Sequence, residues 1–351
     1  MMYYSARRQI LRSLGLVILI ILLIALFVDF DALMEVIRST DWVEYGLAVG
    51  FLLIAYAIYT LRTRYLLQNR VGYLDALAID GGGFMFGVLF SIPTDVFRVV
   101  AMNRSDKVDP SVTGSALTIG AITSMLVRMM GLLFAIVFGA ASSRDATRPL
   151  LSSLLTVVIL LVLLFVLAKN AQRIRPYLAR VLGWIPRVSV ERTERSSAGI
   201  SNTLQEIASF RRFGMSLFLR ILIWVFSLLF YFYAFESMNI ELTTPHLLIP
   251  LSIMVVVPPT SPMMIGVFHG AVIAILGTLG IMGTNDAAAY AVTIHFVQMV
   301  ILIILGFIGL RRLDLKFSTI LKEIRARARR DSEAQTETVT AEEAKPSGVD
   351  G

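Results

Sequence analysis

Several uninterrupted apolar stretches, each about as long as a membrane is thick, dominate the sequence. A helix needs about 20 apolar residues to cross the hydrocarbon core of a bilayer. Hydrophobic residues make up 56% of the 351 residues and charged residues only 16%, which is typical of polytopic membrane proteins. We therefore predict an all-α polytopic membrane protein. About six stretches have the length of a full span: residues 10–28, 42–61, 112–139, 150–167, 215–233 and 287–310.

Basic residues cluster beside these stretches and give the chain a formal charge of +7. Short basic loops mark the cytoplasmic face of membrane proteins. The loops after residues 61 and 104 are basic, as is the long loop 169–213, whereas residues 29–41 are mostly acidic and hold an expected short surface helix at 32–37. This pattern predicts a multi-pass protein of the cell membrane with both termini cytoplasmic. Its partners would be membrane lipids rather than nucleic acid.

One apolar stretch ends too early to cross the membrane. The run 84–92 stops at Pro93 and is followed by Asp95 and Arg98. A charge at bilayer depth costs about 2.5 kcal/mol or more unless it faces protein or water. The ten residues after the break reach only about 15 Å as a helix, so we predict a re-entrant hairpin over residues 76–104. Within it, Asp80 is expected to cap a helix, and the glycines at 81–83 to allow close packing or a bend.

A second interrupted segment lies at residues 247–280. Its first arm, 247–257, is too short to cross the membrane. Three prolines then break the segment: Pro258, Pro259 and Pro262. The order span, hairpin, span thus occurs twice with opposite orientation, which is compatible with an inverted-topology repeat. Arg128 follows Pro93 by 35 residues and His295 follows Pro262 by 33. The order of the long and short arms, however, argues against the repeat.

The charged residues near the first break are candidates for binding an anion. A guanidinium offers a planar fork of donors that suits phosphate, so Arg98 and Arg128 are the first candidates, with Asp95 as a resting partner that a lipid would displace. Helix N-termini after Pro93 and Pro262 would add free amides. Two alternatives remain open. Asp95 and Arg98 can form a purely structural ion pair, and Arg128 can extend to the membrane surface or pair with another acid.

Other chemistry finds little support in the sequence. Cysteine is absent, which excludes disulfides and thiolate sites. The three histidines lack the spacing of a metal site, and the glycine run matches no nucleotide-binding motif, so we predict no metal and no cofactor. His269 and His295 are expected to form hydrogen bonds within the helix bundle, with proton coupling as the alternative.

Two segments at the end of the chain differ in charge. Residues 313–330 alternate basic and apolar side chains, which favours an amphipathic helix on anionic lipid, although a plain basic flank explains the same pattern. Residues 331–351 are polar, acidic and free of aromatic side chains. We predict that they are disordered.

The region around the second break resembles a known family. A proline-rich break is followed by Gly-Val-Phe and then by a long helix with a histidine and a glutamine. These features are similar to the lysylphosphatidylglycerol synthase transmembrane region family of flippase-like proteins. The sequence departs from the family pattern at Met263, Met264 and His269. The matching positions are Pro259, Thr260, Pro262, Gly266, Val267, Phe268, Ala271, His295, Gln298 and Gly306.

The resemblance implies a flippase-like membrane domain. We expect it to translocate an anionic phospholipid or a polyprenyl-linked lipid between leaflets, without being an enzyme itself. The expected substrate-binding residues are Asp95, Arg98, Arg128, Gly266, His269 and His295. One alternative is the membrane subunit of a lipid aminoacylation or glycosyl-transfer system, which would need a lipid-modifying enzyme as partner because only about 40 residues follow the last span, fewer than a catalytic domain requires. Another is a scaffold for envelope lipid synthesis.

Overall fold

The described part of the protein is a bundle of α-helices. A computed structural model describes residues 30–90, 94–104, 108, 110–140, 210–240, 264–278 and 281–315, and the regular structure within these ranges is helical. The helices are α2 (Phe30–Ser39), α3 (Trp42–Leu66), α4 (Tyr73–Phe90), α5 (Thr94–Arg104), α6 (Pro110–Ala140), α10 (Phe210–Glu236), α12 (Met264–Thr278) and α13 (Thr284–Arg312).

Four helices are long and apolar enough to cross a membrane. They are α3, α10, α13 and the part of α6 at Val112–Gly131, and they overlap four of the six expected spans. The other two expected spans, 10–28 and 150–167, lie outside the described residues. So do residues 169–209 of the basic loop, residues 316–330 and the acidic tail.

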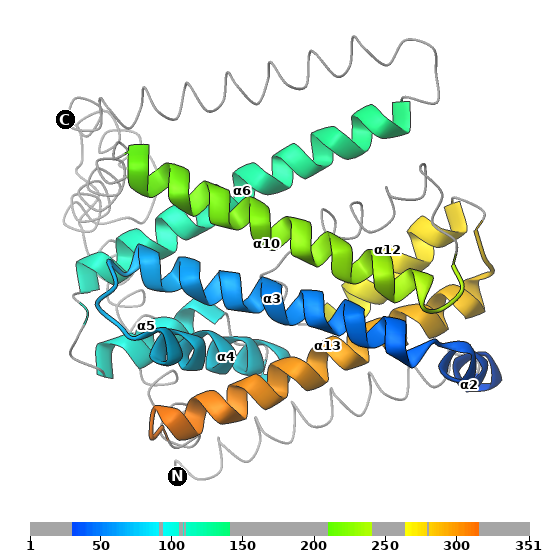
Figure 1. Ribbon diagram of the computed structural model, residues 1–351, viewed down its shortest axis with the longest axis horizontal. Helices are drawn as coiled ribbons and strands as arrows, with labels where there is room; N and C mark the ends of the chain where they lie inside the picture. Colours follow the sequence, from blue (N-terminus) through cyan, green and yellow to red (C-terminus); the bar gives the residue numbers. More distant parts are fainter. Residues whose placement is uncertain are drawn as a thin grey trace, which may run out of the picture.

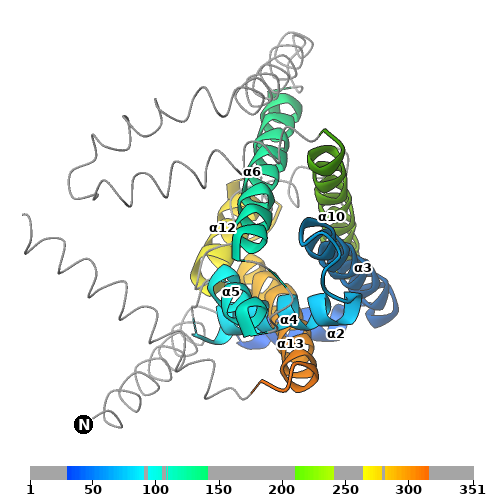
Figure 2. The same cartoon turned by 90° about the vertical axis from the view of Figure 1, so that its left-hand side faces the viewer.

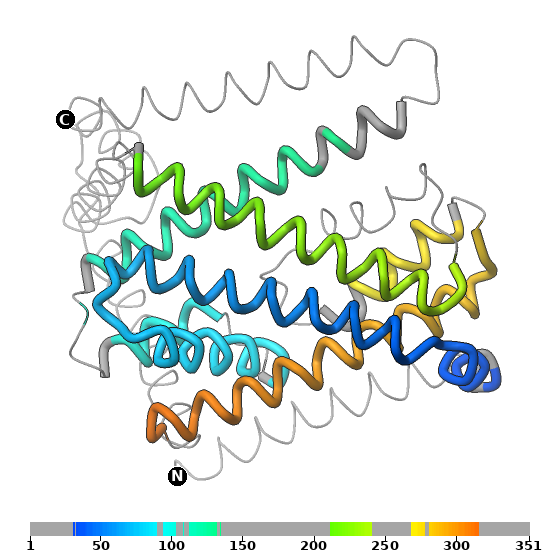
Figure 3. Tube along the Cα trace, in the orientation of Figure 1, coloured from blue at the N-terminus to red at the C-terminus, as the bar shows by residue number. Residues whose placement is uncertain are grey.

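The long helices run the length of the bundle, and the short ones occupy its two ends (Figure 1). Helices α4 and α5 lie at the end where α3 finishes and α10 begins, and α2 and α12 lie at the other end (Figures 1 and 3). Helix α3 packs along α10, and α4 packs along α13. Seen from the α4 and α5 end, α5 lies below α6, and α10 and α3 lie to one side (Figure 2), with α6 in contact with α10.

The first predicted hairpin, residues 76–104, coincides with α4 and α5. The second arm of the second predicted hairpin, residues 247–280, coincides with α12. The breaks themselves are not described: Pro93, Pro258, Pro259 and Pro262 lie outside the described residues, as does the arm 247–257. Helix α2 extends the surface helix expected at 32–37. Helix α10, which follows the basic loop, begins five residues before the expected start of its span at residue 215. Arg211 and Arg212 lie in its first turn and are exposed, so their charges are tolerated there.

The ends of α3 follow from local chemistry. Asp41 caps its N-terminus, where its Oδ1 accepts hydrogen bonds from the backbone N–H of Val43 (2.9 Å) and of Glu44 (3.2 Å). At the other end the helix continues past the expected boundary at residue 61 to Leu66. It stops before Gln68 and Asn69, which both have φ of 56°, in the left-handed region that ends helices. Arg62 is therefore a helical residue.

Glycines bring α4 close to its neighbours. A Cβ added at Gly81 would lie 2.8 Å from the carbonyl oxygen of Leu305 in α13, and one at Gly82 would collide with the Phe97 ring of α5. A Cβ at Gly83 would lie 2.7 Å from Cγ2 of Thr94. The expectation of close packing at these glycines is confirmed. The expectation that Asp80 caps a helix is wrong, because Asp80 lies in the middle of α4 and is 2% exposed.

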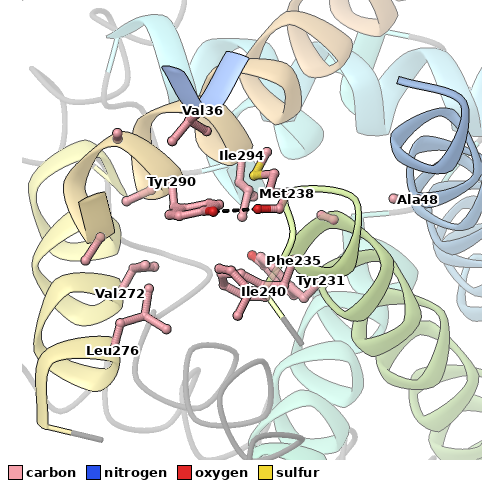
Figure 4. Close-up of a cluster of buried hydrophobic side chains, with 14 of the residues drawn as sticks. Val36, Ala48, Tyr231, Phe235, Met238, Ile240, Val272, Leu276, Tyr290 and Ile294 are labelled. Atoms are coloured by element: carbon pink, nitrogen blue, oxygen red, sulfur yellow. Dashed lines mark hydrogen bonds between the residues drawn. The ribbon is translucent and has the colours of Figure 1, made fainter. Parts of the chain in front are cut away.

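An apolar core fills the opposite end of the bundle. It joins α3 and α10 to α12 and α13, and Figure 4 shows Val272 and Leu276 of α12 facing Tyr231, Phe235 and Ile240 near the end of α10. The hydroxyl of Tyr290 donates a hydrogen bond to the backbone carbonyl of Met238 (Figure 4). We call this cluster the apolar core.

Candidate functional site

A cavity of about 570 Å³ lies among α3, α4, α5, α6 and α10. Its size falls within the range of about 300–1,000 Å³ that is usual for ligand sites. Much of its wall is apolar, with leucine, methionine, alanine and Phe84 side chains. We call it the basic cavity because four arginines line it. The polar lining consists of Tyr59, Arg62, Thr63, Thr94, Asp95, Arg98, Ser124, Arg128 and Arg220.

Arg98 of α5 is held on every side. Its guanidinium donates to Oδ1 of Asp80 from Nε (3.0 Å) and to Oδ1 of Asp95 from Nη1 (2.8 Å). Its Nη2 donates to the hydroxyl of Tyr59 at 2.6 Å. Its Cζ also lies 5.1 Å from the centroid of the Tyr59 ring and 5.7 Å from that of Phe84, in reach of a cation–π interaction.

The two carboxylates around Arg98 differ in exposure. The side chain of Asp80 is 2% exposed, whereas that of Asp95 is 52% exposed. A buried ion pair is strongly destabilised when one partner is removed, so the pair with Asp80 is a fixed part of the fold. The close approach of α4 and α5 at Gly82 and Gly83 places its two members within reach. The pair with Asp95 is accessible to solvent on the side of the carboxylate.

Arg62 joins three helices without a carboxylate partner among the described residues. It extends from α3, and its Nε donates to Oγ of Ser216 in α10 (3.1 Å). Its Nη2 donates to the backbone carbonyl of Gly120 in α6 (2.8 Å) and to Oγ1 of Thr123. The residue is 3% exposed. Its partners are neutral, so its positive charge is not compensated within this network.

Arg128 and Arg220 face the basic cavity from α6 and α10. Arg220 lies ten residues after Phe210, about 15 Å along the helix axis. Its Nε is inaccessible to solvent and has no hydrogen-bond partner within the described ranges. Arg128 forms no hydrogen bond or ion pair with the part of the chain that the structure describes. Both side chains line the cavity, and neither guanidinium has a carboxylate partner within the described ranges.

The charges around the cavity do not balance. Among the described residues, the four arginines face Asp95 and the buried Asp80, so four positive and two negative charges leave a formal excess of +2. An uncompensated charge at membrane depth is costly. The cavity is thus suited to an anion.

Two histidines form a separate cluster at the other end of the bundle. The ring centroids of His269 in α12 and His295 in α13 lie 5.1 Å apart, and the Phe268 ring lies 4.8 Å from that of His295. His295 is 4% exposed, and its Nδ1 has no hydrogen-bond partner among the residues that the structure describes. We call these two residues the histidine pair.

Sequence comparison adds the family. The family described as the lysylphosphatidylglycerol synthase TM region matches residues 11–306, which is most of the chain. The chain belongs to this family. Comparisons with curated proteins and with solved structures return no match. All the residues around the basic cavity lie within the matched range, so the cavity belongs to the family's membrane region.

In this member of the lysylphosphatidylglycerol synthase TM region family, the predicted site residues fall into two groups. Asp95, Arg98 and Arg128 line the basic cavity. His269 and His295 are not among the described residues of its lining, and Gly266 lies in the first turn of α12. The structure therefore does not bring the six predicted residues to one place.

Three charged residues are not among the predicted site residues: Arg62 and Arg220 of the cavity lining, and Asp80, which is buried and pairs with Arg98. Arg62 was assigned to the basic flank after residue 61, although α3 continues through it. Arg220 lies inside the expected span 215–233, where a charge is itself a signal of function. Asp80 was assigned to a helix cap. A search for every charge within or beside the apolar segments would have found all three.

The described residues offer little to a metal ion. No group of three or more His, Asp or Glu side chains converges within the described ranges. What the cavity can do chemically is bind: it presents guanidinium donors and an exchangeable carboxylate, next to apolar side chains.

Proposed function

We propose that this protein moves an anionic lipid between the leaflets of the cell membrane. The basic cavity supports this proposal, because it combines an excess of positive charge with apolar walls among helices long enough to cross the bilayer. A lipid has the same two parts, a charged head group and apolar chains. Membership of the family favours a role in lipid chemistry.

The head group would enter beside Asp95 and Arg98. Asp95 is the exposed partner of Arg98, and a phosphate that displaces it would meet Arg128 on the opposite wall. The buried Asp80 keeps Arg98 in place during the exchange. No nucleotide is needed for this step, so movement runs down a lipid gradient or is coupled to an ion gradient.

The test is head-group translocation by the full chain in vesicles. Lipids carrying a fluorophore would be reconstituted with the protein, and the fraction that becomes inaccessible to an external quencher would be followed over time. We expect Arg128→Ala to reduce the rate at least tenfold, because loss of a charged hydrogen bond costs about 1.5–3 kcal/mol. Arg98→Ala should reduce it as strongly.

Arg311→Ala is the matched control, since Arg311 is exposed at the end of α13 and lies outside the cavity lining. It should leave the rate unchanged, and all variants should be present in the membrane at similar amounts. Unchanged translocation in both cavity variants would refute the proposed site. Modification of a lipid by the purified protein would instead favour an enzymatic role.

A further inference from the structure

We propose that the basic cavity binds a phosphate monoester, a head group with two negative charges, on the wall made by Arg62, Arg128 and Arg220. This inference rests on the proposed function and specifies its substrate class. It also moves the main binding site from Arg98 to the other three arginines of the cavity, on α3, α6 and α10.

Arg98 is already occupied. All three nitrogens of its guanidinium donate to protein oxygens, on Asp80, Asp95 and Tyr59. Two aromatic rings cover its faces. Only the contact with Asp95 can open without breaking buried structure. Arg98 thus offers a ligand one donor edge at most.

The wall made by α3, α6 and α10 has unused donors on Arg128 and Arg220, and Arg62 adds positive charge to it. Arg220 has a buried Nε without a partner within the described ranges. Arg62 has neutral partners, and its charge lies near enough to that of Arg220 to repel it. Arg220 and Arg128 repel each other in the same way. Arg62, Arg128 and Arg220 thus bring three positive charges to the cavity without a carboxylate partner among the described residues, whereas Arg98 is paired with two carboxylates.

The charge count favours a monoester over a diester. The described residues around the cavity carry an excess of +2. A phosphate diester has one negative charge and would leave one guanidinium uncompensated. A phosphate monoester loses its second proton with a pKa of about 6 and carries nearly two negative charges at neutral pH. It also presents three terminal oxygens, enough for several arginine forks.

The apolar lining points to a lipid as the source of the phosphate. Leu117, Met125 and Met129 of α6 line the cavity beside the arginines, and Met125 is 66% exposed. Apolar chains attached to the phosphate can lie along this face of α6. A small soluble phosphate would gain nothing from these side chains.

The experiment compares two lipids that differ in the ester. Fluorescent phosphatidic acid, a monoester, and fluorescent phosphatidylglycerol, a diester, would carry the same acyl chains. Binding to the full-length protein in detergent and translocation in vesicles would be measured for each at pH 7.5. We expect phosphatidic acid to bind about tenfold more tightly or better, as for one additional charge-assisted hydrogen bond. Equal binding of the two lipids would overturn the inference.

Two variants locate the preference. Arg128→Gln and Arg220→Gln should each lower the binding ratio of monoester to diester toward one, while Arg311→Gln should leave it unchanged. Arg220→Lys restores the charge and should recover part of the ratio, which separates a binding role from a folding defect. A ratio that persists in both glutamine variants would refute the assignment of the wall.

A pH series and a soluble competitor complete the test. Lowering the pH from 7.5 to 5 removes the second charge of the monoester and should reduce its binding toward that of the diester. The charge of the diester is constant over this range, so the diester serves as the control for changes in the protein. Glycerol 3-phosphate should compete poorly; efficient competition would assign the site to a soluble phosphate and overturn the lipid assignment.

If phosphatidic acid binds preferentially but neither lipid crosses, the monoester site stands and the translocation proposal fails. If both cross at equal rates and bind equally, translocation stands and the monoester site fails.

Discussion

The basic cavity and the apolar core occupy opposite ends of one bundle, and each lies beside a segment that contains prolines in its sequence. In the first, four arginines and two aspartates gather around a hollow. In the second, aromatic and aliphatic side chains fill the space, and the polar groups, among them the histidine pair and tyrosine hydroxyls, are uncharged or weakly basic side chains rather than arginines and aspartates. The same order of span and short helix thus supports two different interiors.

The difference lies in what the following span contributes. Arg128 of α6 faces a cavity, whereas His295 of α13 is buried against Phe268. These two residues hold corresponding places if the halves are related by an inverted repeat, which stays a prediction. In that arrangement the first half supplies three of the four arginines of the basic cavity, and α10 of the second half supplies Arg220.

The largest effect expected from this comparison concerns the buried ion pair of the cavity. Asp80→Asn leaves the buried Arg98 without its fixed partner. Removal of one member of a buried pair costs about 3–5 kcal/mol, so the apparent midpoint of thermal unfolding in detergent should fall by many degrees. Asp75→Asn is the matched control, because Asp75 lies in the same helix and pairs with Arg312 at the surface, where a pair contributes about 0–1 kcal/mol.

A second variant tests whether the loss comes from the unpaired charge. Adding Arg98→Gln to Asp80→Asn removes both charges and should recover part of the thermal stability. Equal, small shifts for Asp80→Asn and Asp75→Asn would mean that the cavity pair is no more important to the fold than the surface pair.

A smaller effect separates the helix contacts of the two ends. Gly81→Ala places a methyl group 2.8 Å from a backbone carbonyl of α13, which cannot rotate away. Such overpacking costs about 1–3 kcal/mol. Gly270→Ala in α12 meets no atom within 4 Å and should be neutral or stabilising by up to about 1 kcal/mol, the helix preference of alanine over glycine. Unfolding midpoints of the two variants measure the contrast, and similar values would show that α4 and α13 are not tightly packed.

Hydropathy was sufficient to predict much of the fold. The four described spanning helices and the short helices α4, α5 and α12 arise where apolar runs are full-length or interrupted. The ion pair of Asp95 and Arg98, three residues apart on one helix, also follows from local spacing. These features depend on neighbours in the sequence.

The rest of the cavity depends on distant neighbours. Arg62 bonds to Ser216, 154 residues away, and no local pattern predicts that contact. Hydropathy also placed the end of α3 before Arg62, because a charge normally marks the edge of a span. Asp80 was assigned to a cap for a similar reason, since its partner Arg98 lies on another helix. A charged residue whose partner is distant in the sequence therefore looks, in the sequence alone, like the end of a helix.

The smallest effect expected concerns the histidine pair. His295→Phe preserves a flat ring against Phe268 and removes a buried nitrogen that has no partner within the described ranges. An unsatisfied buried polar group costs about 1–3 kcal/mol, and the larger ring adds some overpacking, so the two effects oppose each other and thermal stability should change little. Lipid translocation should stay within about twofold of the unmodified protein, since ΔΔG near zero leaves rates unchanged.

Arg128→Ala measured in the same vesicles gives the scale of a true cavity defect. A loss as large in His295→Phe would place the histidine pair in the translocation pathway, and loss of the pH dependence of transport in that variant would identify it as a proton site. Either result would mean that both ends of the bundle take part in translocation.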